Sequence, residues 1–293
     1  MLAALLTALC WTASSIASAR SAALLGGMVA NRARLALASA LLATALVVVG
    51  YGHWTPQAWW FILSGAIGLG LGDIALFLAY ERLGARLPAL LTHCFGAPLG
   101  ACIEWWWLGN GLHLPEVIGI GLILSGVALA LLRHDGAQGL RLDLAGVGLG
   151  LMSAAGLATS AVVSRQGYAA AITAGTPLPW LDAALLRNLG GLAAMIAIIP
   201  LWSWLRPEAP RQRPWRTAAP WLIMTSIVGP GVGVACLQWA LSTTKAGVVQ
   251  AIVALIPVLV IPLAWWIDGD RPSMRAVIGG VIAVGGVAVM ALW

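Results

Sequence analysis

Long apolar runs, separated by short connections rich in glycine, proline or charge, follow one another along the 293-residue chain. Each run is about 20 residues long, which as a helix rising ~1.5 Å per residue crosses the ~30 Å hydrocarbon layer of a bilayer. The pattern therefore predicts an all-α polytopic membrane protein with ten transmembrane helices. The predicted spans are residues 2–24, 30–50, 57–80, 86–108, 115–132, 141–164, 181–204, 218–241, 246–267 and 273–292.

Composition supports a membrane protein and argues against other classes. Hydrophobic residues make up 61% of the chain and charged residues 9%, whereas a soluble domain carries about 25% charged residues. The net charge of +6 comes from single basic residues in short connections, a distribution typical of membrane orientation signals and not of nucleic-acid binding. Cysteines lie inside apolar runs without metal-ligand spacing, so we expect no metal site. They are Cys10, Cys94, Cys102 and Cys236.

The chain contains an internal repeat. A shift of 159 residues superposes everything from span 3 onward on span 8 onward without a gap. Earlier in the chain, TASSIASAR ending at Arg20 resembles LATSAVVSR ending at Arg165, and Arg34 at the opening of span 2 resembles Arg187 at the opening of span 7. The gapless shift places Gly70 on Gly229, Gly72 on Gly231, Pro98 on Pro257, and Trp106 and Trp107 on Trp265 and Trp266.

Five spans are thus duplicated, and we expect repeats at residues 1–136 and 137–293. Because five is odd, the second copy crosses the membrane in the opposite sense. Inverted repeats are typical of secondary transporters, whose two halves expose a central site alternately to each side. The sequence contains no pattern typical of a nucleotide site, a cofactor site or an enzyme, so a gradient of solute or ions would have to drive transport.

Two copies of a five-span unit resemble the EamA branch of the drug/metabolite transporter superfamily. The first half carries LGDIALFLAYERLGARLPALLTHCFGAPLGACIEWWWLGNGL and PEVIGIGLILSGVALALL. The second carries GVACLQWALSTTKAGVVQAIVALIPVLVIPLAWWIDGD and IGGVIAVGGVAVMAL. The family commonly has Gly-Glu after its fourth and ninth spans, where this chain has Gly109-Asn110 and Gly269-Asp270.

The resemblance implies a multi-pass protein of the inner (plasma) membrane that exports amino acids or similar small metabolites by alternating access. Two alternatives remain open at this point: uptake or exchange of another organic solute, and a membrane scaffold that transports nothing. The partners that we expect are a small-molecule substrate, the lipid bilayer and protons as a coupling ion, with the protein a monomer.

Two ionisable residues are the leading candidates for a substrate site. Asp73 and His93 lie seven or more residues from the nearer span end, which is roughly 10 Å into the layer. A charge at that depth costs at least ~2.5 kcal/mol, so such residues usually face a bundle interior or a watery cavity. We expect a central cavity lined by Asp73, Phe77 and His93, with Trp11, Gln238 and Trp239 nearby.

Each polar feature also has a purely structural interpretation. A hydrogen bond between Asp73 and His93 would tie spans 3 and 4 together without binding anything. Glu104 lies close enough to its span end to reach the interface, and Trp105 to Trp107 suit an aromatic belt at the headgroups. Pro98 and Pro257 remove backbone hydrogen bonds and predict kinks, which would also serve as hinges beside a central site.

The orientation of the chain in the membrane is predicted differently by two arguments. Of the 16 lysine and arginine residues, 12 lie in odd-numbered connections, 2 in even-numbered ones, and Arg34 and Arg187 open spans. Positively charged connections stay in the cytoplasm, so this bias places both termini outside. The family resemblance implies the reverse, with both termini cytoplasmic.

Overall fold

The computed structural model describes residues 1–50, 52, 54–84, 86–109, 113–131, 143–205, 213–260 and 274–292. All regular elements in these ranges are helical. Trp265, Trp266, Gly269 and Asp270, and the expected boundary between the halves at 136 and 137, lie outside them.

The described residues of the first half form eight helical segments, which are α-helical except for one 3-10 and one π-helical segment. They are α1 (Leu2–Leu25), α2 (Gly27–Val49), η1 (Pro56–Ala58), α3 (Trp59–Gly65), η2 (Ala66–Gly72), α4 (Asp73–Leu83), α5 (Arg86–Leu108) and α6 (Leu114–Leu131). The second half contributes α7 (Leu144–Thr173), α8 (Trp180–Leu205), α9 (Trp215–Ser226), η3 (Ile227–Gly231), α10 (Val232–Thr243), α11 (Ala246–Val253) and α13 (Met274–Leu292).

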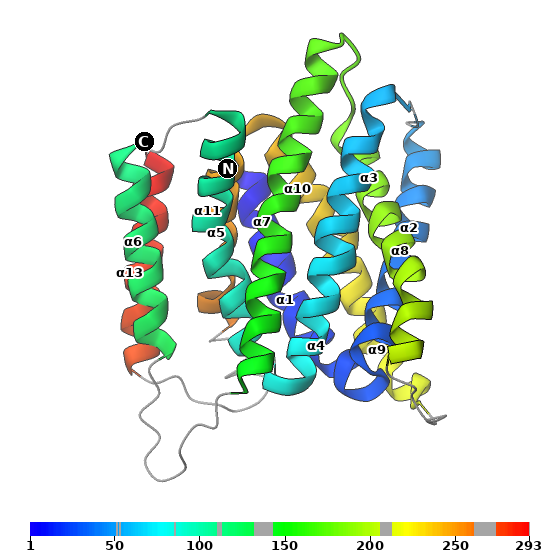
Figure 1. Cartoon of the computed structure of the whole chain (residues 1–293), viewed down its shortest axis with the longest axis horizontal. Helices are drawn as coiled ribbons and strands as arrows, with labels where there is room; N and C mark the ends of the chain where they lie inside the picture. The colour runs from blue at the N-terminus through cyan, green and yellow to red at the C-terminus, as the bar shows by residue number, and fades with distance from the viewer. Residues whose placement is uncertain are drawn as a thin grey trace.

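The helices run side by side as a bundle, and both termini lie at the same end of it (Figure 1). Six helical stretches are long and apolar enough to cross a membrane: Leu2–Leu25, Gly27–Val49, Pro56–Leu83, Leu144–Thr173, Trp180–Trp204 and Trp215–Thr243. The chain enters α1 from the end that carries the termini and enters α7 from the opposite end (Figure 1). The two first helices of the expected repeats therefore run in opposite senses.

Both third spans are interrupted by a π-helical segment at corresponding positions. The 159-residue shift places Gly72, the end of η2, on Gly231, the end of η3. Glycine favours such a departure because it tolerates unusual backbone geometry, and Pro230 in η3 cannot donate a helical hydrogen bond. Buried asparagines satisfy carbonyls of these segments: Asn188 donates to Pro230 O at 2.8 Å, and Asn31 to Leu69 O at 3.5 Å.

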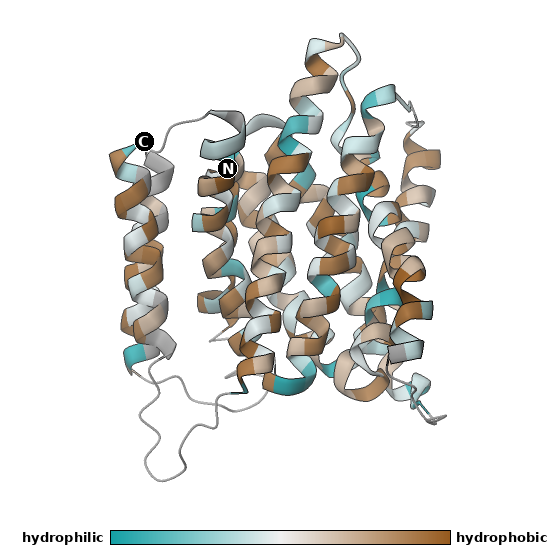
Figure 2. Cartoon of the chain, in the orientation of Figure 1, coloured by the Kyte–Doolittle hydropathy of each residue, from teal (hydrophilic) through white to brown (hydrophobic). Residues whose placement is uncertain are grey.

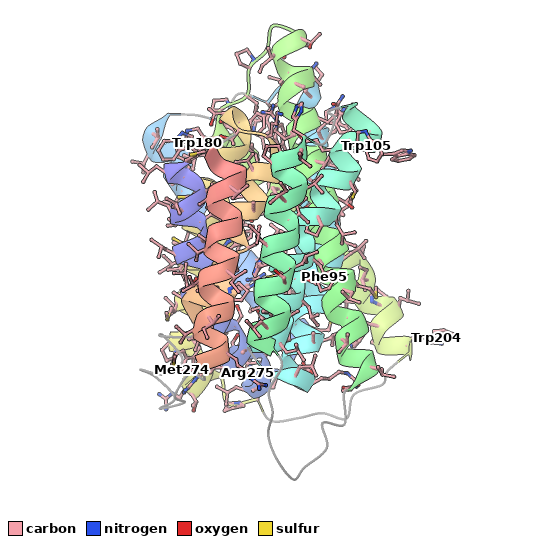
Figure 3. All side chains as sticks on the ribbon, turned by 90° about the vertical axis from the view of Figure 1, so that its left-hand side faces the viewer. Phe95, Trp105, Trp180, Trp204, Met274 and Arg275 are labelled. Atoms are coloured by element: carbon pink, nitrogen blue, oxygen red, sulfur yellow. The ribbon has the colours of Figure 1, made fainter. Side chains whose placement is uncertain are left out.

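The halves interlock at several helix pairs. α1 packs against α9 and α10, α7 packs against α4 and α5, and α6 and α13 form a pair at one edge of the bundle (Figures 1 and 3). α3 and α8 approach most closely, since a Cβ on Gly65 would lie 1.8 Å from the carbonyl oxygen of Arg187. A Cβ on Gly190 would lie 2.0 Å from the carbonyl oxygen of Ile62.

Hydrophobic residues make up most of each helix, and hydrophilic residues occur mainly toward the helix ends and at isolated positions along the helices (Figure 2). Val47 and Val48 are 82% and 81% exposed, as suits side chains in contact with lipid. Trp105 and Trp204 project outward near opposite ends of the bundle (Figure 3). Their positions agree with the aromatic belts predicted from the sequence.

Three expectations need correction or refinement. Glu104 is buried and accepts a hydrogen bond at 3.1 Å from the backbone N–H of Gly247, at the start of α11, so it does not reach toward the interface. There its charge meets the positive end of a helix dipole. Pro98 lies within the continuous helix α5. Pro257 follows a turn at 254–255 in a helical stretch that resumes at 256, so the two prolines differ in their surroundings.

A candidate solute cavity with two buried arginines

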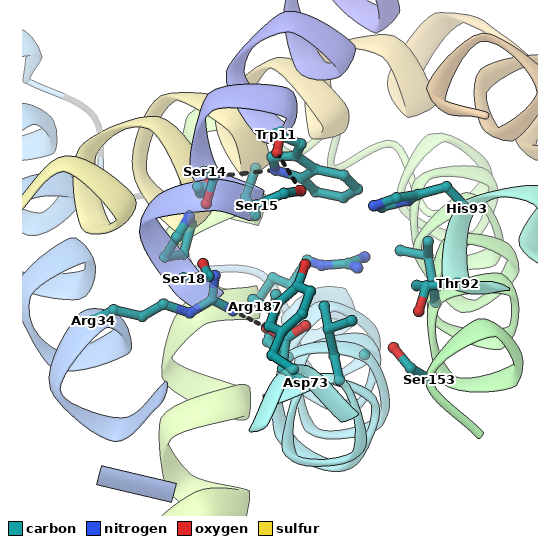
Figure 4. Close-up of a pocket in the computed structure, with 18 residues that line it drawn as sticks. Trp11, Ser14, Ser15, Ser18, Arg34, Asp73, Thr92, His93, Ser153 and Arg187 are labelled. Atoms are coloured by element: carbon teal, nitrogen blue, oxygen red, sulfur yellow. Dashed lines mark hydrogen bonds and ion pairs between the residues drawn. The ribbon is translucent and has the colours of Figure 1, made fainter. Parts of the chain in front are cut away.

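A small cavity of about 50 Å³, lined by charged, polar and apolar side chains, lies within the bundle. That space accommodates a few waters or a small solute. Both halves of the chain line it, and both π-helical segments reach it (Figure 4). Its lining residues include Trp11, Arg34, Asp73, His93, Arg187 and Gly229.

Arg34 and Arg187 are the structure's main addition to the sequence-based site. Each was expected to open its span, but α2 begins at Gly27 and α8 at Trp180, so each arginine is the eighth residue of its helix. Seven residues of helix correspond to about 10 Å. Both side chains are accordingly buried, Arg34 at 6% exposure and Arg187 at 0%.

Arg34 is held by an ion pair. Its Nη2 donates to Oδ2 of Asp73, and its Nε donates to Oδ1 of Asn31 at 3.0 Å. The guanidinium carbon also lies 4.6 Å from the ring centroid of Phe77, in cation–π geometry. A carboxylate, an amide and an aromatic face thus compensate this buried cation from three directions.

Arg187 is held by neutral groups. Its Nη1 donates to the hydroxyls of Ser64 at 2.8 Å and Ser164 at 3.2 Å, and its Nη2 donates to that of Ser160 at 2.9 Å. Its Nε has no hydrogen-bond partner among the described residues. In Figure 4 the side chain extends between Trp11 and Asp73 toward the middle of the cavity residues. Within the described chain, no carboxylate forms a hydrogen bond or ion pair with Arg187.

The repeat explains this asymmetry. The 159-residue shift that aligns the two third spans places Asp73 on Val232. The duplicated architecture therefore kept an arginine in each half but a counter-ion in only one. The glycines of the broken helices reach across to the other half: a Cβ on Gly68 would lie 2.5 Å from Ser160 Oγ, and one on Gly229 2.6 Å from Ser14 Oγ.

The wall opposite the arginines carries neutral polar groups and an indole. His93 is buried, and its Nδ1 has no hydrogen-bond partner in the described part of the chain. Its ring lies 5.8 Å from that of Trp11, whose Nε1 donates to Gly229 O at 3.3 Å. Thr92 and Ser153 complete this side (Figure 4). The cavity thus offers cations on one wall and neutral donors and acceptors on the other.

A family model described as the EamA-like transporter family matches the chain twice, over residues 1–132 and 144–292. The chain belongs to the EamA-like transporter family. A solved structure titled "Crystal structure of protein" is similar, with 19% identity, a TM-score of 0.76, and coverage of 99% of this chain and 96% of that chain. At that identity the likeness concerns the fold. No curated protein matches the chain.

In this EamA-like transporter the structure brings together only part of the predicted site. Trp11, Asp73 and His93 line the cavity. Phe77 lies behind Arg34, and Gln238 donates to Ser164 Oγ at 3.1 Å, one hydrogen bond removed from Arg187. Trp239 is 39% exposed and stacks on Trp180 at 6.1 Å, away from the lining residues.

The alternative interpretation, a hydrogen bond between Asp73 and His93 that ties spans 3 and 4 together, is not what the structure has. Asp73 pairs with Arg34, and within the described residues His93 Nδ1 has no partner. The missed residues carried a signal in the sequence, because Arg34 and Arg187 are single cations within otherwise apolar stretches and correspond in the two halves. Both also lie within the predicted spans, Arg34 as the fifth residue of 30–50 and Arg187 as the seventh of 181–204.

Proposed function

We propose that this protein is a secondary transporter of ten transmembrane helices, built from inverted repeats at 1–136 and 137–293, that moves a small organic solute by alternating access. One observation carries the proposal: a polar cavity at mid-bundle lined by both halves, with a π-helical break from each half at its wall. Interrupted helices beside a central site are what alternating access requires, because local breaks let helix segments reorient around bound solute.

By family resemblance the substrate is an amino acid or a related metabolite, and the direction is export across the inner (plasma) membrane. Asp73 and His93 both line the cavity, and we expect protons to couple to transport through them. The protein would act as a monomer, because each chain contains both halves of its own site. Pro98 and Pro257 would be hinge positions in α5 and the helical stretch that resumes at 256.

The charge bias supports an orientation with both termini outside the cell. The termini lie at one end of the bundle, while the basic residue Arg275, at the start of α13, lies at the opposite end (Figures 1 and 3). A reporter fused after Trp293 that is active only outside the cytoplasm would support this orientation. Activity only in the cytoplasm would reverse it.

Solute flux in proteoliposomes tests the function. Purified protein should accelerate counterflow of at least one member of a panel of labelled amino acids, hydroxy acids and organic cations over protein-free vesicles. His93→Ala should weaken that flux, because His93 lines the cavity beside Trp11. Ser125→Ala, at an exposed position on α6, is the matched control.

The flux assay also separates the rivals. Uptake or exchange of a different solute would appear as flux of another panel member or in the opposite direction. A membrane scaffold would leave the vesicles as impermeable as protein-free ones for every solute. That last result would contradict the proposed function.

A further inference from the structure

We propose that the cavity binds a small solute of net charge −1 through its carboxylate, and that Arg187 is the group that binds it. The inference deepens the proposed function by naming the chemical class of the solute. It nevertheless concerns binding and can be tested without transport.

The charged residues that line the cavity favour an anion. The cavity is lined by two cations, Arg34 and Arg187, and by one anion, Asp73. Asp73 forms its ion pair with Arg34 and interacts with Arg187 only through space, so the three groups together carry one excess positive charge. Asp182 lies five residues before Arg187 on α8 and does not line the cavity. A buried, uncompensated cation is costly, and a bound monoanion would remove that cost.

The geometry of the Arg187 guanidinium also favours a carboxylate. Serine hydroxyls hold Nη1 and one N–H of Nη2, so the guanidinium is fixed in place by its terminal nitrogens. Nε remains without a partner among the described residues. The Nε and Nη2 edge of an arginine matches the two oxygens of a carboxylate, which accept two parallel hydrogen bonds. Because Arg187 is fully buried, the side chains around its Nε would have to shift locally to admit the carboxylate.

The charges that line the cavity disfavour cations and zwitterions. An organic cation would meet an environment that already has excess positive charge, and the single carboxylate there is engaged by Arg34. A zwitterionic amino acid would bring an ammonium group to the same place. The opposite wall, with Trp11, Thr92 and His93, suits an apolar stem that ends in a hydroxyl or carbonyl. The expected order of affinity is therefore carboxylate anion, then zwitterion, then neutral amide and cation.

Thermal unfolding of the purified full chain with matched solutes tests the inference. The probes are lactate, alanine, lactamide and alaninamide, and their longer analogues phenyllactate, phenylalanine, phenyllactamide and phenylalaninamide. All are compared at equal concentration and ionic strength. A solute that binds only the folded protein raises Tm. In at least one series the hydroxy acid should give the largest shift, with an affinity about tenfold above that of its amide, the factor that ~1.4 kcal/mol represents.

Three variants locate the anion. Arg187→Gln should abolish the preference for the hydroxy acid. The double variant Arg34→Gln with Asp73→Asn removes one cation and one anion together, so Arg187 keeps its excess charge and the preference should persist. Ser125→Ala should match the wild type. If Arg187→Gln does not fold, the double variant and the wild-type series still decide the question.

Several results would overturn the inference. These are equal or larger Tm shifts with the amides or cations, no shift in either series, or loss of the preference in the double variant. Flux measurements keep the two proposals apart. Anion binding without flux of any solute contradicts the transporter function and leaves the anion site standing. Flux of a cation with no anion binding contradicts the anion site and leaves the transporter function standing.

Discussion

The two buried arginines occupy corresponding places in the two halves of the chain, yet they are stabilised by different means. Arg34 is the eighth residue of α2 and is neutralised by Asp73, while Arg187 is the eighth residue of α8 and is solvated by three serines. The first arrangement is complete without a ligand. The second leaves a charge and an N–H group unmatched, which is the property expected of a binding residue.

The difference also shows how a duplicated fold acquires an asymmetric centre. Both halves kept the glycine-rich break, the arginine, and an asparagine that bonds a carbonyl of a break. Only the first half has an aspartate after its break, because Val232 stands where the shift would place it. One substitution between otherwise matched elements therefore decides the net charge of the cavity.

The largest effect is expected from Asp73→Asn, which makes the two arginines alike by removing the counter-ion of Arg34. Breaking a buried ion pair by removing one partner leaves an uncompensated charge and costs about 3–5 kcal/mol. Denaturant unfolding in detergent should show the loss. The double variant Arg34→Gln with Asp73→Asn should be less destabilised than the single one. A single variant as stable as the double would contradict the assignment of this pair.

Gly68→Ala should come next, because it forces a methyl group onto the Arg187 side of the cavity. The new Cβ would lie 2.8 Å from Ser160 Cβ and 3.0 Å from Arg187 Nη2. Overpacking of this kind costs roughly 1–3 kcal/mol. Gly148→Ala, on α7 with open space around its Cβ position, is the control and should leave unfolding unchanged. Equal Tm values for the two variants would show that the backbone of η2 can shift to accommodate the added methyl group.

Ser160→Ala should have a smaller effect, because it removes one of the hydroxyls that hold Arg187. A hydrogen bond to a charged group contributes about 1.5–3 kcal/mol, and the other serines retain part of that. Unfolding of purified Ser160→Ala should show the loss, whereas Ser125→Ala, exposed on α6, should not. If Ser160→Ala matched the wild type, Arg187 would not depend on its serines.

The smallest effect is expected at an exposed ion pair, which serves as the reference for the buried one. Arg82 Nη1 lies 2.9 Å from Asp143 Oδ2, just before α7, and this hydrogen bond lowers the pKa of Asp143 below its ordinary 3.8. A lowered carboxyl pKa contributes stability above about pH 3.8 that is lost as pH falls through the folded-state value. Arg82→Gln should shift Tm only slightly at pH 7 and not at all near pH 2. A large shift at pH 7 would contradict this account.

The fold could be predicted from the sequence because lipid imposes a simple pattern on it. Apolar runs of spanning length give the helices, and the 159-residue repeat together with the quoted motifs gives the EamA family. Helix ends were less predictable. α2 begins three residues and α8 one residue before the predicted spans 30–50 and 181–204. The apolar pattern does not show which way a side chain points, so it did not reveal that Arg34 and Arg187 are both buried in the bundle.

The candidate site could be predicted only in part for a related reason. Depth in the membrane singles out Asp73 and His93, because charge is costly there, and both line the cavity. Depth does not say which way a helix is rotated. Phe77 and Gln238 face neighbouring side chains, and Trp239 turns outward, because packing partners that the sequence does not reveal set the rotation of α4 and α10.

The close contact between α3 and α8 has a mechanical consequence. The two backbones are in direct contact where Gly65 faces Arg187 and Gly190 faces Ile62. Because no side chain separates the helices at these points, they have little room to slide past each other. The two helices come from opposite halves, and separating them would expose two bare stretches of peptide to lipid. If one half rotates relative to the other, we expect the rotation axis to lie near this helix pair. The helices farthest from the pair would then be displaced the most.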